Sequence, residues 1–181
     1  KKLMTTLKVK IWGARGSFPI TELNESFGGE TSCVEVRTSD DDLILLDMGT
    51  GLRNFGNSLI KEKSNIKDIN IFLSHYHYDH IMDYPRLVLT RWDHGGDEVK
   101  PLKVYGPDPL QKINDRFIGP SGAFALDIAA RTQSPASIAV YHARGGFGDR
   151  PRPDPKLTQV AQGDVIEGAD WLIKVGPARH V

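Results

Sequence analysis

The sequence predicts an α/β fold in which layers of sheet are covered by helices. Three observations point to this class. The first half of the chain contains four short apolar or alternating segments that are separated by turns. A segment with helical spacing joins two of these segments, as in a strand–helix–strand crossing. The 181 residues, 39% of them hydrophobic, are also enough for one domain with a substantial core.

The first half of the chain supplies the most regular elements. Residues 7–13 and 33–38 alternate apolar and polar side chains, which is typical of half-buried strands. Residues 43–49 begin with four consecutive apolar residues and predict a strand that is buried on both faces. Residues 51–62 carry apolar side chains at helical spacing, and residues 69–75 form the next predicted strand.

The second half is expected to contain helices and strands in a less regular order. Asp108 and Pro109 are typical of a helix start, with the aspartate as N-cap and the proline at the first helical position. The predicted elements are helices at 84–92, 108–118 and 122–133, strands at 101–107 and 137–143, a loop at 144–155, a hairpin at 157–168 and a last strand at 171–181.

Composition argues against several classes of protein. No apolar run approaches the roughly 18–20 residues that a membrane helix needs, and no signal peptide is visible, so no membrane partner is expected. The formal net charge is zero, whereas a protein that grips duplex nucleic acid more often carries a basic excess. Cys33 is the one cysteine, so no intrachain disulfide can form and a cytoplasmic location is expected.

The stretch LSHYHYDHIMD, residues 73–83, holds three of the six histidines and follows the apolar run INIFL. His75 and His77 are two residues apart, so at a strand end both side chains project to the same side. Asp79 and His80 follow as the chain turns, and two neighbouring metals could share the four groups. Imidazole and carboxylate are ligands expected for zinc, iron or manganese. A solvated turn or structural histidines form the weaker alternative.

The pattern HYHYDH resembles the H-x-H-x-D-H signature of the metallo-β-lactamase fold superfamily. GARGSFP (13–19), FGGETSCVEVR (27–37) and LILLDMGTGLR (43–53) resemble segments of its ribonuclease Z-like and phosphodiesterase-like branches. The segment FALDIAARTQSPASIAVYHARGG resembles an insertion seen in bacterial ribonuclease Z-like members. The resemblance implies a four-layer αββα sandwich.

The resemblance also implies how the chain is divided. Residues 1–181 would belong to a single metallo-hydrolase domain, with a first αβ half at 1–95, a helical insertion and loop at 96–156 and the start of the second half at 157–181. The family pattern continues with a metal-bridging aspartate and a final histidine that this sequence does not supply. His94 and His142 stand in other contexts and are expected to be solvated or structural. The sequence is therefore expected to be a fragment, incomplete at its C-terminus.

Carried over by position, the resemblance implies two metal ions, expected to be zinc with manganese or iron as alternatives. The implied ligands are His75, His77 and His180 for the first ion, and Asp79 and His80 for the second. Asp79 would also orient the attacking metal-bound hydroxide, which makes it the candidate catalytic residue. Asp47 matches a carboxylate that orients a ligand histidine. An ordinary turn aspartate is the alternative for Asp47.

Two glycine-rich loops would lie near the metals in this fold, and their backbone N–H groups could hold phosphate oxygens. The candidate substrate contacts are Arg15, Ser17, Thr31 and Ser32. Tight turns without a ligand are the alternative. The arginines Arg144, Arg150 and Arg152 could form an RNA-binding arm, although a solvated loop is the simpler interpretation.

The predicted function is hydrolysis of a phosphodiester, either small and cyclic or at an RNA end, by a binuclear metal-dependent enzyme that uses a metal-bound hydroxide. Hydrolysis of lactone, ester or amide rings on the same metals is the first alternative, because one fold hosts many substrates. A non-catalytic binding module is the second. A homodimer is left open.

Overall fold

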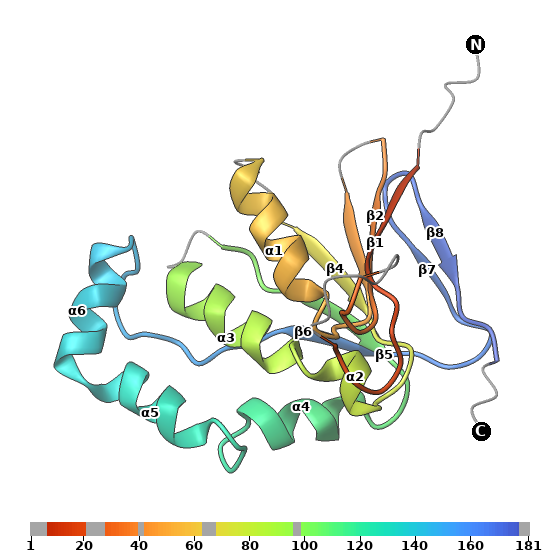
Figure 1. Ribbon diagram of the computed structural model, residues 1–181. Coiled ribbons are helices and arrows are strands. Elements are labelled where there is room, and N and C mark those ends of the chain that lie inside the picture. The colour runs from red at the N-terminus through yellow and green to blue at the C-terminus, as the bar shows by residue number, and fades with distance from the viewer. Residues whose placement is uncertain (1–6, 21–27, 40–41, 63–67, 96–98, 178–181) are drawn as a thin grey trace.

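The computed structural model describes residues 7–20, 28–39, 42–62, 68–95 and 99–177. These residues form a six-stranded mixed sheet and a separate two-stranded sheet, with helices on one side (Figure 1). The strands of the larger sheet, in spatial order, are β1 (Lys8–Gly13), β2 (Cys33–Arg37), β3 (Leu43–Leu46), β4 (Ile69–Phe72), β5 (Lys103–Gly106) and β6 (Lys156–Gln159).

Strand direction in this sheet decides where the histidine segment lies. β1, β2 and β3 pair antiparallel, whereas β3, β4, β5 and β6 run parallel. Parallel neighbours need crossover connections, which α1 (Leu52–Lys61) provides after β3, and α2 (Tyr78–Ile81) and α3 (Tyr84–Gly95) provide after β4. The carboxyl ends of β3 and β4 therefore meet at one edge, where the N–H of Asp47 donates to the carbonyl of Phe72 at 2.9 Å.

The main core lies between the sheet and the helices that cover it. Leu43 and Leu45 of β3 are fully buried and Ile44 is 3% exposed, as expected for a strand covered on both faces. Phe55 of α1 and Tyr84 of α3 are also buried in this cluster. Figure 1 shows α1 and α3 side by side over the same face. This packing fixes the sheet edge that carries the histidines.

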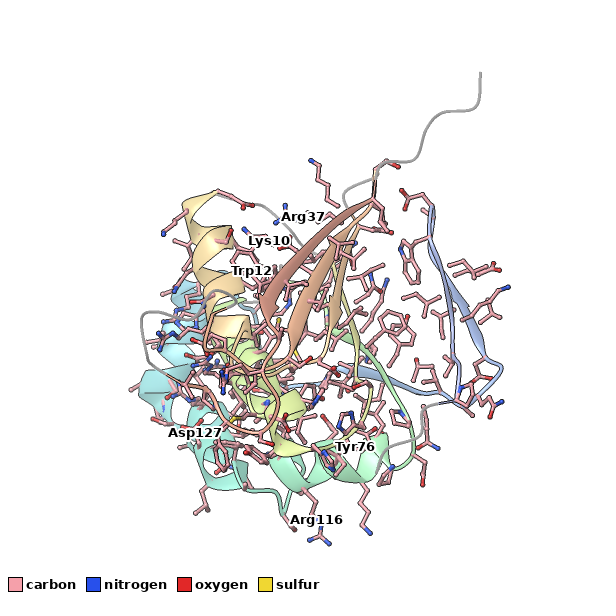
Figure 2. The ribbon with its side chains drawn as sticks, turned by 45° about the vertical axis from the view of Figure 1, so that its right-hand side comes forward. Lys10, Trp12, Arg37, Tyr76, Arg116 and Asp127 are labelled. Carbon is pink, nitrogen blue, oxygen red and sulfur yellow. The ribbon has the colours of Figure 1, made fainter. Side chains whose placement is uncertain are left out.

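The two-stranded sheet, β7 (Val165–Glu167) and β8 (Leu172–Lys174), covers the other face of the larger sheet (Figure 1). Trp171 anchors it, because its ring meets that of Phe72 edge to face at 6.1 Å and its indole N–H donates to Asp42 at 2.8 Å. Figure 2 shows side chains of both sheets filling the space between them. The described residues therefore contain helix, sheet and sheet layers in that order, and the predicted layered α/β class is confirmed.

Three helices lie between β5 and β6: α4 (Leu110–Ile118), α5 (Ala125–Gln133) and α6 (Pro135–Ala143). The predicted strand at 137–143 is wrong, because these residues are helical. Pro135 occupies the first turn, where its fixed φ favours a helix, and three alanines follow. Tyr141 is the one buried residue of α6, so no sheet neighbour competes with this local preference.

Two further expectations need correction. The predicted hairpin at 157–168 does not form: β6 pairs parallel with β5, whereas β7 pairs antiparallel with β8. The segment from residue 157 onward therefore contributes strands to both sheets. The alternation of apolar and polar residues alone could not reveal this division. Asp108 is not the N-cap of α4, because Pro109 holds that position without a side-chain cap bond. No helix in the described ranges is long and apolar enough to cross a membrane.

Arginines of the loop after α6 form hydrogen bonds and ion pairs with α3 and α4. Asp93, near the end of α3, accepts a bond from Arg150 at 2.7 Å and pairs with Arg131 of α5 at 3.0 Å. Arg144 donates to the Asp93 carbonyl at 2.7 Å. Arg152 donates to the carbonyl of Ile118 at 3.0 Å. Arg150 is buried and therefore not solvated, whereas Arg144 and Arg152 are exposed, as a solvated loop predicts. An RNA-binding arm stays a prediction.

Candidate metal centre

The histidine segment leaves the sheet at the end of β4 and runs without regular structure to His77, which is the N-cap of α2. The ring centroids of His75 and His77 are 4.7 Å apart, and those of His75 and His80 are 4.0 Å apart. The three imidazoles that the sequence predicted together therefore form one cluster, at the edge where β3 and β4 end.

Asp79 lies beside this cluster and is 5% exposed. Its Oδ2 is 3.6 Å from the Nε2 of His80 and accepts the backbone N–H of Ser17 at 2.8 Å. Burial would raise the pKa of Asp79, but N–H donors, first of all that of Ser17, and the nearby imidazoles hold it below its usual range. The carboxylate is therefore ionised at neutral pH and can only accept hydrogen bonds.

Asp47 contacts the histidine cluster through His80. Its carboxylate lies 2.8 Å from the Nδ1 of His80 and accepts the backbone N–H of Ser74 at 2.8 Å. The hydroxyls of Ser32 and Ser74 also donate to it. With Nδ1 of His80 donating to Asp47, the lone pair of that ring is on Nε2, the atom that faces Asp79. The position therefore suits a residue that orients a histidine.

The backbone of Asp47 is itself unusual, with φ at +60°, a region that costs energy for a residue with a side chain. The turn that follows is fixed by hydrogen bonds: the N–H of Met48 donates to the carbonyl of His80 at 2.6 Å. At Gly49 an added Cβ would lie 2.3 Å from the carbonyl of Asp79. Close approach of this turn to α2 therefore requires glycine and sets the position of Asp79 and His80.

Both glycine-rich loops adjoin the cluster, but the four substrate candidates differ in access. Ser17 is exposed, while Ser32 is partly buried and bonded to Asp47. Arg15 is partly buried and pairs with Thr31 in an isolated bridge. Thr31 is fully buried and its hydroxyl accepts the N–H of Thr50 at 2.8 Å. Thr31 is therefore closed to a ligand, and its place in the candidate set is not supported.

The donor set agrees with a metal site in its chemistry, since imidazole and carboxylate are zinc, iron and manganese ligands. Two ligand atoms on one tetrahedral zinc lie about 3.3–3.6 Å apart, given zinc–ligand distances of about 2.0–2.2 Å. The separation of 3.6 Å between Asp79 and His80 fits such a pair. Within the described ranges, however, no three His, Cys, Asp or Glu side chains are arranged to hold a metal ion. His180, the remaining predicted ligand, lies outside the described residues.

Some residues of this region were not anticipated. Ser74 joins Asp47 to the histidines, because its hydroxyl is 2.9 Å from the Nδ1 of His75 as well as bonded to the Asp47 carboxylate. Its only signal in the sequence is its place directly before His75. His94 and His142 behave as expected for structural histidines, with ring nitrogens close to the carbonyls of Thr90 and Gly148.

Several known proteins are similar to this chain in sequence or in fold. Ribonuclease Z of Methanosarcina mazei is 22% identical over 175 residues, which cover 96% of this chain and 45% of that protein. Ribonuclease Z of Halobacterium salinarum is 28% identical over 138 residues, covering 76% of this chain and 41% of that protein. The crystal structure of the metallo-beta-lactamase fold protein YhfI from Bacillus subtilis matches with a TM-score of 0.52 and 22% identity, over 90% of this chain and 50% of that one.

The likeness to YhfI shows the fold, and this chain spans half or less of the length of each of these relatives. The family model described as Metallo-beta-lactamase superfamily matches residues 27–180, most of the sequence. The resemblance drawn from HYHYDH is thus confirmed, and the chain belongs to the metallo-beta-lactamase superfamily.

Proposed function

We propose that this chain is part of a metal-dependent hydrolase that cleaves phosphodiester bonds. The observation that carries the proposal is the arrangement around His80, with Asp47 at its Nδ1 and Asp79 facing its Nε2. Membership of the superfamily and the curated relatives named ribonuclease Z support hydrolysis of a phosphodiester. The whole protein's activity is an inference, because the relatives extend well beyond the matched part.

The residues that would hold the metals are His75, His77 and His180 for one ion, and Asp79 and His80 for a second. Divalent ions at such a site lower the pKa of water to about 7 and polarise the phosphoryl group. Asp79 would accept a hydrogen bond from the attacking water and orient it. Asp47 would keep the His80 ring in the tautomer that leaves Nε2 free.

Phosphate oxygens would be held by the loop at 13–19, with Arg15 and Ser17 as candidate contacts. The loop lies against the centre, because the N–H of Ser17 donates to Asp79. Ser32 would act indirectly, because its hydroxyl donates a hydrogen bond to the Asp47 carboxylate. We further propose that residues 1–181 belong to one metallo-hydrolase domain, that zinc is the natural metal, and that the protein is cytoplasmic. A homodimer stays a prediction.

The metal content provides the first prediction. The full-length protein should carry about two first-row metal ions per chain, and His77→Ala should lose at least one, because the first ion then loses one of its imidazole ligands. Elemental analysis after reconstitution with zinc, manganese or iron measures this. His94→Ala is the matched control, since His94 is exposed and its ring lies against Thr90. Equal metal content in both variants and the parent protein would contradict the assignment.

The reaction provides the second prediction. Metal-loaded full-length protein should hydrolyse an activated aryl phosphodiester and a cyclic nucleotide, with turnover that exceeds any on a lactone or a β-lactam. The glycine-rich loop beside the centre, with Arg15 and the exposed Ser17, and the curated relatives named ribonuclease Z favour a phosphodiester over an apolar ring. Turnover of the lactone or β-lactam without detectable phosphodiester cleavage would replace the proposed substrate with the acyl alternative. The absence of turnover on all four would favour a binding module.

A further inference from the structure

Two aromatic rings stand exposed beside the candidate metal centre. Phe18 is 69% exposed and Tyr78 is 45% exposed, and their ring centroids are 5.7 Å apart at an angle of 52°. Phe18 follows Ser17, whose N–H bonds Asp79, and Tyr78 directly precedes Asp79. The two rings therefore come from segments 60 residues apart in the chain and meet at the residue proposed to orient the attacking water.

A strained turn holds Phe18 in this position. The N–H of Phe18 donates to the carbonyl of Gly16 at 3.0 Å, which closes a γ-turn, and Ser17 at its centre has φ at +65°. Gamma turns with positive φ are rare and strained, especially around a residue other than glycine. The same turn directs the N–H of Ser17 to Asp79. Placement of Phe18 and placement of Asp79 are thus parts of one local arrangement.

A third exposed apolar side chain lies close to the aromatic pair in the chain. Met82 lies four residues after Tyr78, directly after α2, and is also 45% exposed. Residues at this spacing face the same side of a helix. Single exposed apolar residues are common on proteins, but here three lie beside one centre. Such a surface can bind the flat face of an aromatic group, because stacking needs no hydrogen-bond partners.

We propose that Phe18 and Tyr78 form a stacking platform for the planar base of a nucleotide whose phosphate lies at the metal centre. The proposal rests on the phosphodiesterase function proposed above and specifies the group next to the scissile bond. Stacking is tolerant of base identity, because every base has a π-face. The platform therefore favours nucleotides over phosphate esters without an aromatic group, with little preference among bases.

The test compares two probes that differ only in the base. Adenosine 5′-monophosphate and ribose 5-phosphate are titrated by calorimetry into metal-loaded full-length protein. We expect the nucleotide to bind at least about tenfold more tightly, since removal of one stacking ring in other proteins costs about five- to 100-fold. Phe18→Ala with Tyr78→Ala should bring this ratio close to one and leave the affinity for ribose 5-phosphate unchanged. Tyr78→Phe, which keeps the ring, should retain the preference.

Phe147→Ala is the matched control, because Phe147 is also a strongly exposed aromatic residue, at 89%, but lies in the loop after α6 and not in the segments that form the platform. It should leave both affinities unchanged. A parent protein that does not prefer the nucleotide, or a preference that survives loss of both rings, would overturn the platform. Failure to hydrolyse any phosphodiester would refute the proposed function instead, while the binding ratio would still decide the platform.

Discussion

Replacing Asp79 by alanine is expected to lower kcat for phosphodiester hydrolysis by about 10³-fold, with a much smaller change in KM. Positioned groups that handle a proton in the transition state typically contribute about 10²–10⁴-fold. Asp79 suits this role because it is buried, ionised and held by the N–H of Ser17. A loss confined to kcat means that the interaction is made mainly in the transition state.

Two further variants separate chemistry from folding. Asp79→Asn keeps the size of the side chain and an oxygen for the N–H of Ser17, but removes the negative charge, so it should lose most of the activity while the melting temperature stays close to that of the parent. Ser17→Ala retains the backbone donor and should keep the kcat effect small. A large rise in KM with kcat preserved in Asp79→Asn would show that Asp79 serves ground-state binding instead.

The parts of this centre that could be predicted from sequence are those whose residues lie close together in the chain. His75, His77, Asp79 and His80 lie within one stretch that follows a buried strand, so their spacing alone predicts the cluster. Asp47 was identified through a family resemblance, and the geometry around its carboxylate stays compatible with that role. Its positive φ and its bond to Ser74 could not be inferred, because both depend on how β3 and β4 meet.

Contacts between distant segments account for what the sequence did not reveal. The bond from Ser17 to Asp79 spans 62 positions, and the pairing of Phe18 with Tyr78 follows from it.

The helix α6 was mistaken for a strand because Ile138, Val140 and Tyr141 are residues that favour strands. Helix formation prevailed because α6 packs against α5, outside the sheet, where strand pairing has no partner.

The ion cluster around Asp93, near the end of α3, carries the largest expected effect on stability, because its member Arg150 is buried. Asp93→Ala should lower the free energy of unfolding by about 3 kcal/mol, which corresponds to a fall of about 6–12 °C in Tm for a chain of this size. The side chain of Arg150 is only 2% exposed and its guanidinium lies 4.2 Å from the centre of the Trp92 ring. Removal of Asp93 leaves this buried cation without its carboxylate, which is costlier than losing an exposed pair.

The pH dependence of this effect has a definite sign. Burial would raise the pKa of Asp93, but the hydrogen bond from Arg150 and the charges of Arg131 and Arg150 hold it below its usual range. A carboxyl whose pKa is depressed by folding stabilises the protein above the pKa of the unfolded chain, and this contribution is lost as pH falls through the folded value. The difference between parent and Asp93→Ala should therefore be full at neutral pH and shrink below about pH 4.

Urea unfolding at about pH 7 and about pH 3, on either side of that range, measures this difference, and Asp127→Ala supplies the control. Asp127 pairs with the same Arg131 at 3.0 Å, but its side chain is 49% exposed, so its loss should cost no more than about 0.5 kcal/mol. Hydrogen exchange in α5 and α6 should rise in Asp93→Ala alone, because Arg131 and Arg144 tie these helices to α3 through Asp93. Equal destabilisation by the two variants, or a difference that persists unchanged in acid, would show that the Asp93 carboxylate is not what holds α5 and α6 against α3.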